Sequence, residues 1–375
     1  TIDGMARAPA IDDAATVVVF HAVHAILFPS QNLDANVEVW KISPTGTGLT
    51  ALTSSLLSDT LGSFFPSISG DGTRVAFLSL ANSTGGNADF SPEIFTIKLD
   101  KTGLAQNTTS SWAFTGAPSI TPDGSRIAFA SGANLLGADA GNNAELYVEQ
   151  ANGTGLAKLT SSIKGDVGGT SITTNGSRIA FQSAGNYGSN SDNNDEIFVV
   201  NADGLVLAQL TSTSGSLTAS VSNQNPRISG NGSRIVFQSN ADLTFFNDTA
   251  TTEIFAINPE GTGMQQLTSA AAGASTGPRI DATGTLVAFG STANLLGTNP
   301  EGNSEIFVVG ANGTGLVQLT STATGASGAP DISTDGLWVV FSSTADLVAG
   351  GNTDLNRELF VIGTGGSGLR QLTHT

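Results

Sequence analysis

The chain has 375 residues and no cysteine, which excludes disulfide frameworks, cysteine-based zinc sites and thiol nucleophiles. Its 14 Lys and Arg residues against 31 Asp and Glu residues give a formal charge of −17, so nucleic acid is not expected as a partner. No apolar run reaches the roughly 18 residues that cross a bilayer, so membrane insertion is not expected either. Scarce lysine with abundant Gly, Ser, Thr and Asn is typical of secreted proteins, and it predicts an extracellular or periplasmic protein, mature after removal of a signal sequence.

A unit of about fifty residues recurs seven times along the chain. It opens with a segment such as APSITPDGSRIAF at 117–129, and this segment ends in phenylalanine in every copy: Phe20, Phe77, Phe129, Phe181, Phe237, Phe289 and Phe341. The copies extend approximately over 8–54, 65–110, 117–161, 169–212, 225–269, 277–321 and 329–374. Seven equivalent units predict a single repetitive domain over 1–375.

Each copy continues through a polar loop into a short apolar run that begins with glutamate, such as EIFVV. Most copies close with a glycine turn and a final run, as in GTGLVQLTS at 313–321. Runs of β-branched and aromatic residues between Asp-Gly, Asn-Gly or Thr-Gly turns predict strands and hairpins. Four antiparallel strands in each of seven units predict an all-β fold, a seven-bladed β-propeller.

The combination of PxISxDGxRIAFxS, EIFVV and GTGLxQLT resembles the repeat of the TolB-like (WD-like) β-propellers, and it covers essentially the whole chain. The resemblance implies the propeller fold and a secreted or periplasmic setting, but it implies no particular activity. Copy one departs from the pattern, with Ala14-Ala15 in place of Asp-Gly and with His21 and His24 in the segment that bears serine elsewhere.

The polar loop before each glutamate has oxygen-bearing side chains at alternate positions, which is how a turning backbone surrounds Ca²⁺. The candidate calcium ligands are, copy by copy, Asn32, Asp34, Asn36 and Glu38; Asn87, Asp89 and Glu93; Asp139, Asn143 and Glu145; Asn190, Asp192, Asn194 and Glu196; Asn299, Glu301, Asn303 and Glu305; and Asn352, Asp354, Asn356 and Glu358. Copy five has Thr249 and Thr251 and loses the acid, so its loop is not expected to bind metal.

The alternative is a clasp that needs no ion. Asn and Asp side chains would form local turns, and the glutamate would accept hydrogen bonds from the loop and tie it to the start of the strand. The clasp explains why Glu253 persists in copy five, where the other acids are gone.

Conventional catalytic residues are scarce. The only histidines are His21, His24 and His374, and His21 and His24 would point to opposite faces of a regular strand. One G-x-S-x-G match, at 273–277, lies in a predicted blade-joining loop with no helix to follow, so it lacks the context of a nucleophile elbow. The chain is therefore predicted not to be an enzyme.

The long, variable loops fall on one face of the predicted disc, because the loop after strand two and the loop between blades emerge on the same side. The sequence predicts a non-catalytic interaction or structural scaffold that binds a protein or glycan partner through this face. Two alternatives remain: a carbohydrate-active hydrolase or lyase that uses acidic residues at the central channel, and a self-assembling subunit of an extracellular filament or coat.

Copy seven contains its own fourth strand, RQLT, so the N-terminus is not needed to complete that blade. Ring closure is expected to rest on side chains between the first and seventh blades. Residues 1–7 then have no assigned place in the ring.

Overall fold

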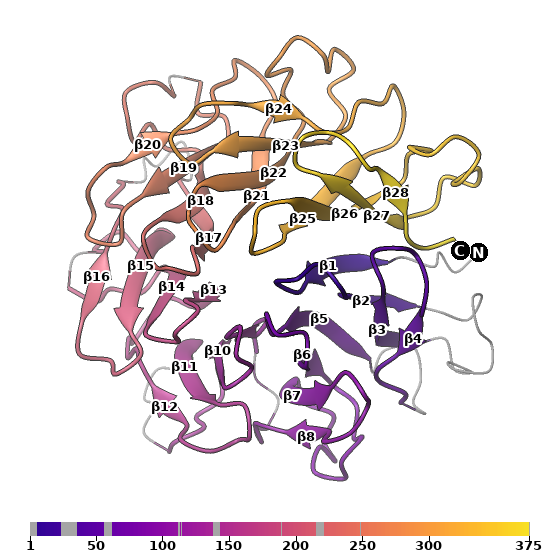
Figure 1. The fold of residues 1–375 in the computed structure, drawn as a ribbon. Coiled ribbons are helices and arrows are strands. Elements are labelled where there is room, and N and C mark those ends of the chain that lie inside the picture. Colours follow the sequence, from indigo (N-terminus) through magenta and orange to yellow (C-terminus); the bar gives the residue numbers. More distant parts are fainter. Residues whose placement is uncertain are drawn as a thin grey trace.

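The computed structural model describes residues 6–23, 36–55, 62–111, 113, 115–137, 143–188, 190–214, 221–247 and 249–374. These residues form seven four-stranded antiparallel sheets, arranged as blades around a common centre (Figure 1). The predicted all-β, seven-bladed propeller is confirmed. The described residues contain no helix long and apolar enough to span a membrane.

Each blade uses its strands in chain order from the centre to the rim (Figure 1). The first strands are β1 Arg7–Ile11, β5 Ser63–Ile68, β9 Ser119–Ile120, β13 Val167–Ile172, β17 Asn223–Ile228, β21 Ser275–Ile280 and β25 Ser327–Ile332. The second strands are β2 Val18–Val23, β6 Arg74–Ser79, β10 Arg126–Ser131, β14 Arg178–Ser183, β18 Ile235–Ser239, β22 Leu286–Ser291 and β26 Trp338–Ser343. The third strands are β3 Val37–Ile42, β7 Glu93–Lys98, β11 Glu145–Gln150, β15 Glu196–Asn201, β19 Glu253–Ile257, β23 Glu305–Gly310 and β27 Glu358–Gly363. The fourth strands are β4 Thr50–Ala51, β8 Ala105–Gln106, β12 Ala157–Lys158, β16 Leu207–Gln209, β20 Gln265–Gln266, β24 Val317–Gln318 and β28 Arg370–Gln371.

The hydrophobic core is divided into seven clusters, and each cluster lies between two neighbouring blades. The repeated phenylalanines belong to these clusters, and all seven are at most 2% exposed. In most blades this ring stacks on an aromatic ring of strand three, as Phe181 does on Phe198 with centroids 5.4 Å apart. One sheet alone cannot bury both of its faces, so the ring itself supplies the core.

Blade one keeps the repeat geometry despite its altered sequence. Ala15 has φ of +50°, whereas the matching residue is glycine in the other blades, for example Gly124 with φ of +65°. This left-handed conformation favours glycine, so blade one retains the turn at some cost in backbone strain.

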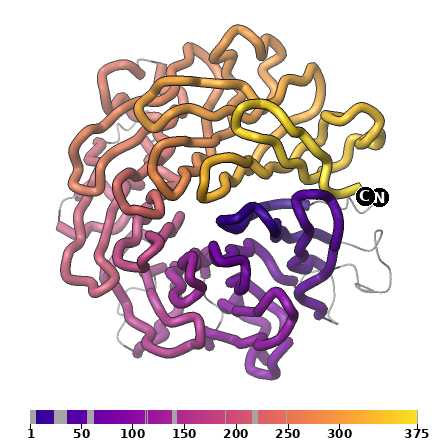
Figure 2. Tube along the Cα trace, in the orientation of Figure 1, coloured from indigo at the N-terminus to yellow at the C-terminus, as the bar shows by residue number. Residues whose placement is uncertain are grey.

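The ring closes without strand exchange. β28 pairs with β27 of its own blade, and β1 pairs with β2. One core cluster combines Phe20 and Trp40 of blade one with Val340 and Leu359 of blade seven, so closure by side-chain packing is confirmed. Figure 2 shows the chain passing from blade to blade around the ring until blade seven lies beside blade one. Residues 1–7 were expected to have no assigned place in the ring. This expectation was wrong for the last two of them, because Ala6 is buried and Arg7 begins β1.

Candidate functional site

Seven equivalent positions line the central channel, one on each first strand, directly before the last isoleucine of that strand. They are Ala10, Ser67, Ser119, Ser171, Arg227, Arg279 and Asp331. In six blades the pairing of strands one and two shifts register just before this position, as between Gln224 and Arg227. A β-bulge re-aims the side chain that follows it, and in these six blades the bulge comes directly before the residue that lines the channel.

Small polar residues occupy this ring in blades two to four and link neighbouring blades. Ser119 Oγ accepts the backbone N–H of Ile172 at 3.3 Å, and Ser171 Oγ accepts that of Ile228 at 3.2 Å. At the closure point, Asp331 Oδ2 accepts the N–H of Ile11 at 3.1 Å. The ring positions therefore have a structural role on one side of the channel.

Blades five to seven place three charged side chains in the ring. Arg279 Nε lies 3.4 Å from Asp331 Oδ1, and both side chains are half-buried. Burial, helped by the nearby Arg279 and opposed by Asp331, lowers the pKa of Arg227 to about 9. Burial also lowers the pKa of Arg279 and raises the pKa of Asp331. The channel thus carries two cations and one anion inside a protein of charge −17.

The two arginines differ in their partners. Arg279 has the carboxylate of Asp331, whereas Arg227 Nη1 donates to the carbonyl oxygens of Thr170 and Pro226 at 3.3 and 3.1 Å. Among the described residues, the only ion pair of the channel ring is Arg279 with Asp331. Arg227 is therefore the channel group best placed to meet an anionic ligand.

A cavity of about 320 Å³ is lined by these ring positions and by residues just before them on the first strands, such as Phe65 and Pro66. Phe65, 47% exposed and with φ of +50°, lies at its wall. Side chains of the second strands hold the wall in place: His21 Nδ1 accepts the N–H of Phe65 at 3.2 Å, and Gln182 Oε1 accepts that of Asn225 at 2.7 Å. His21 thus occupies the position of Gln182 as a structural acceptor, and burial, helped by Arg7, lowers its pKa to about 4.

The predicted loop glutamates all lie buried at the start of strand three and act as a clasp. Glu305 Oε1 accepts the N–H of Thr322 at 2.8 Å, and Glu305 Oε2 accepts the hydroxyl of Thr320. The same hydroxyl accepts the N–H of Ile306 at 2.8 Å. The hydroxyl contact recurs at Glu38, Glu93, Glu145, Glu196, Glu253 and Glu358, with a threonine 15 residues later.

The clasp proposed as the alternative to calcium is therefore present, and the prediction of calcium in the loops stays a prediction. Asn143, Asn194 and Asn303 donate from Nδ2 to the same segment after strand four. Three of the predicted calcium ligands, Asn32, Asp34 and Asp139, lie outside the described residues.

The other catalytic candidates are not brought together. Ser275 lies within β21 rather than in a loop, is fully buried, and shares a 3.0 Å hydrogen bond with Ser291. His374 is exposed at the end of the described chain, and His24 lies outside the described residues. The G-x-S-x-G match therefore has no catalytic geometry.

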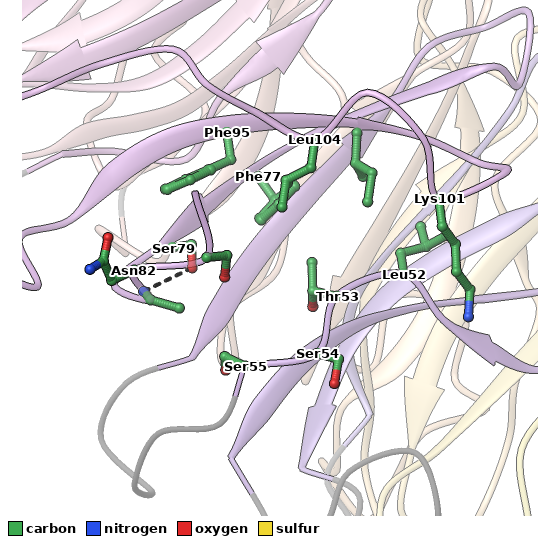
Figure 3. Close-up of a pocket in the computed structure, with 13 residues that line it drawn as sticks. Leu52, Thr53, Ser54, Ser55, Phe77, Ser79, Asn82, Phe95, Lys101 and Leu104 are labelled. Carbon is green, nitrogen blue, oxygen red and sulfur yellow. Dashed lines mark hydrogen bonds between the residues drawn. The ribbon is translucent and has the colours of Figure 1, made fainter. Parts of the chain in front are cut away.

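A second cavity, of about 410 Å³, lies between blades one and two (Figure 3). Phe77, Phe95 and Leu104 form its apolar wall, and the segment 52–55 forms the opposite wall. Ser83 is at its edge, at the repeat position that holds Leu243 in blade five and Leu347 in blade seven. Those leucines pack into the matching clusters, so the short serine side chain accounts for the cavity.

No protein-family model and no curated protein sequence matches the chain. Solved structures do match it. A prolyl endopeptidase gives a TM-score of 0.64 at 10% identity, over 99% of this chain and 50% of that chain. An oligogalacturonate lyase from Vibrio parahaemolyticus gives 0.61 at 13% identity, over 94% of this chain and 87% of that chain. A protein described as a putative TolB from Agrobacterium tumefaciens gives a TM-score of 0.50 at 15% identity, over 85% of this chain and 94% of that chain.

The fold is that of a TolB-like seven-bladed propeller, as the repeat motifs predicted. This chain spans half the length of the prolyl endopeptidase that it matches. Two of these three similar proteins are enzymes, which overturns the prediction that the chain is a non-catalytic scaffold. At identities of 10 to 15% the likeness shows the fold alone, so a particular activity must rest on residues of this chain.

The channel residues were not among the predicted site residues. The signal was the variable residue before the isoleucine of the PxI motif, which reads PAI, PSI, PSI and TSI in copies one to four and PRI, PRI and PDI in copies five to seven. Its meaning depends on closure of the ring, because only then do Arg227, Arg279 and Asp331 line one cavity.

Proposed function

We propose that this protein is a carbohydrate-active enzyme of the lyase type, acting on oligosaccharides that contain uronic acids and binding them in the central channel. The observation that carries this proposal is Arg227, a guanidinium that lines the channel cavity and is bonded there to carbonyl groups rather than paired with a carboxylate. A sugar carboxylate offers the bidentate acceptor that a guanidinium prefers.

Lyase chemistry fits the channel better than hydrolysis. A glycoside hydrolase generally uses two carboxylates on either side of the bond, whereas the channel ring supplies one, Asp331. In β-elimination the C5–H bond breaks and its proton goes to a base, the C4–O bond breaks, and a C4=C5 double bond forms. The leaving oxygen takes a proton from solvent.

Two side chains fit the roles that this reaction needs. Arg227 would bind the uronate carboxylate and make the neighbouring C–H more acidic. Asp331 would accept the proton, since burial raises its pKa above that of an exposed aspartate while Arg279 beside it favours the ionised form. The likeness to oligogalacturonate lyase supports this proposal because it extends over 87% of that chain. Phe65 adds an exposed ring at the cavity wall for contact with a sugar face.

The test is ultraviolet detection of unsaturated uronate products when the purified chain is incubated with polygalacturonate, alginate or glycosaminoglycan oligomers. Arg227→Gln should weaken substrate binding and lower kcat/KM at least about 100-fold. Asp331→Asn should retain binding and lose turnover to a similar extent.

The matched control is Arg178→Gln, because Arg178 is a surface arginine paired with Glu260 and away from the channel cavity. This variant should keep wild-type activity, and thermal unfolding of each variant shows that it is folded. If no uronate oligomer binds the wild-type chain, or if Arg227→Gln binds and turns over as the wild type does, the proposal is wrong.

We also propose that the protein acts outside the cytoplasm, in the periplasm or beyond it. Scarce lysine, the absence of cysteine and a fold shared with a TolB protein support this location. Fractionation of cells that express the full gene tests it, and recovery of the protein with the cytoplasmic fraction would contradict it.

A further inference from the structure

The loops before strand three in blades four and six each hold two buried amide oxygens that accept no hydrogen bond from the described residues. These atoms are Oδ1 of Asn190 and Asn194 in blade four and Oδ1 of Asn299 and Asn303 in blade six. Asn190 and Asn299 are each only 2% exposed. Most buried polar groups have a partner, so four such oxygens at matching places call for a ligand.

Flipping these side-chain amide groups would not give the buried oxygens hydrogen-bond partners. Nδ2 of Asn190 donates to the carbonyl oxygen of Asn194 at 2.8 Å, and Nδ2 of Asn194 donates to that of Thr213 at 2.9 Å. Asn299 and Asn303 make the same two contacts in blade six, each at 2.9 Å. A flipped amide would place oxygen against a carbonyl oxygen, so the present orientation is fixed by the chain itself.

Blades two and five show where these side chains point, because their loops carry a hydroxyl at the third alternate position. Ser91 Oγ lies 3.1 Å from Asn87 Oδ1 and 3.0 Å from Asp89 Oδ1. In blade five, Thr251 Oγ1 lies 3.2 Å from Asn247 Oδ1. The three alternate side chains therefore converge, and in blade five the Thr251 hydroxyl lies within hydrogen-bonding distance of the first amide oxygen.

The backbone of the loop is alike in these blades. The residue before the third position has a positive φ throughout: 57° at Phe90, 56° at Asn193, 51° at Ala250 and 69° at Gly302. Where asparagine replaces the hydroxyl, an acceptor oxygen takes the place of a donor. Blades four and six then present two amide oxygens with a carboxylate between them in sequence, Asp192 or Glu301.

We propose that the loops 190–194 and 299–303 each bind a Ca²⁺ ion through the two asparagine oxygens and the intervening carboxylate. Neutral amide and carboxylate oxygens are ligands that calcium accepts in a flexible arrangement, with water completing the shell, whereas Mg²⁺ demands stricter geometry. The described His, Asp and Glu side chains alone form no metal-binding group of three, so the amides are essential to these sites.

The clasp glutamates are not ligands in this proposal. Glu196 and Glu305 accept hydrogen bonds with both of their carboxylate oxygens. One carboxylate per site implies weak binding, with a dissociation constant on the order of 10⁻⁴ to 10⁻³ M. Blade five binds no ion, because Thr249 stands where the acid would be and a threonine hydroxyl replaces the second amide oxygen. Blade seven has the same residue spacing but is not assigned a site, because Asn356 Nδ2 donates to the loop carboxylate, Asp354 Oδ2, at 3.0 Å.

Equilibrium dialysis of the chelator-treated full chain against CaCl2 tests the proposal. The wild type should bind calcium at two sites and show a higher unfolding temperature with calcium than with equal MgCl2. Asp192→Thr with Asn194→Thr gives blade four the blade-five residues and should remove one site. Glu301→Thr with Asn303→Thr, added to the first pair, should remove both sites and the calcium-dependent shift.

The control for lost charge is Asp203→Asn, which removes one carboxylate from the exposed hairpin turn of blade four and should leave both sites intact. The reverse change, Thr249→Asp with Thr251→Asn, should add a site in blade five. Either of two results would overturn the proposal: no calcium-specific binding up to about 10 mM CaCl2, or unchanged binding by the fourfold variant.

Discussion

Glu149 is a charged residue in a position built for an apolar one. It lies in β11 opposite Ile127, where the other blades place residues such as Val200 or Ile257 against the same strand. Its side chain is 1% exposed, and its two carboxylate oxygens make no hydrogen bond of normal geometry with the described residues. Burial raises its pKa from 4.5 to about 7, with Asn107 opposing the shift.

This shift makes the stability of the fold depend on pH near neutrality. The folded state holds the proton more tightly than the unfolded chain, so the stabilisation is complete below pH 4.5 and is lost as pH rises through about 7. Glu149→Val should remove that loss and raise the free energy of unfolding at pH 8 by about 2–3 kcal/mol. Urea unfolding at pH 5 and pH 8 measures it, and equal pH dependence in variant and wild type would contradict the burial argument.

Ser83 leaves an apolar cavity at a position where blades three to seven carry a large side chain packed against the core. Ser83→Leu should place an apolar side chain against Phe77 and Phe95, as Leu243 is placed against its own blade. The expected gain is about 1–2 kcal/mol, or an unfolding temperature higher by about 1–3 °C for a domain of this size. Ser83→Ala is the matched control and should change little, and a destabilised leucine variant would show that the cavity cannot take the side chain.

At the scale of the element, the clasp explains two separate features of the repeat. The glutamate at the start of strand three and the threonine in the LTS segment after strand four are 15 residues apart. They meet because strands three and four pair antiparallel, which brings the end of strand four beside the start of strand three. The threonine hydroxyl then links the carboxylate to the backbone N–H at the start of strand three.

Thr320→Val tests the clasp without changing the size of the side chain. The variant leaves the Ile306 N–H and one oxygen of Glu305 without their partner, so the free energy of unfolding should fall by about 2–3 kcal/mol. Thr320→Ser keeps the hydroxyl and should lose less than half as much. Calorimetry of the three proteins decides, and equal losses for valine and serine would mean that packing of the methyl group, not the clasp, explains the threonine.

The repeat allowed the fold to be predicted because the strand and turn signals recur in most of the seven copies. Phe181 and its equivalents mark the blade interfaces, and the Asp-Gly and Asn-Gly turns mark the hairpins. The clasp could be proposed as an alternative from the persistence of Glu253, although its threonine partner was not recognised. Arg227 could not be assigned a role from sequence, because seven residues about fifty positions apart become neighbours only when the ring closes.

At the scale of the whole molecule, the junction between blades seven and one differs from an internal junction. Internal junctions on one side of the channel use a serine hydroxyl, as Ser119 does toward Ile172. The closing junction uses the carboxylate of Asp331, which accepts the N–H of Ile11 and also pairs with Arg279. In the turns between the first and second strands, Thr334 Oγ1 donates to the Asp13 carboxylate, and the N–H of Asp13 donates to the carbonyl oxygen of Gly70 at 3.0 Å.

These contacts predict that Asp331 is the ring residue whose loss costs most. Asp331→Ala removes the acceptor of the Ile11 N–H and leaves Arg279 without its counter-charge, so the free energy of unfolding should fall by about 3–5 kcal/mol. Asp331→Ser restores the kind of acceptor that blades two to four use and should recover part of this loss, while the charge of Arg279 stays uncompensated. Ser119→Ala, at an internal junction, should cost only about 1–2 kcal/mol. Denaturant unfolding of the three variants ranks them, and hydrogen exchange at the Ile11 amide should rise in Asp331→Ala and return toward the wild-type rate in Asp331→Ser. If Ser119→Ala proved as costly as Asp331→Ala, closure would depend on the side-chain core between blades one and seven and not on this contact.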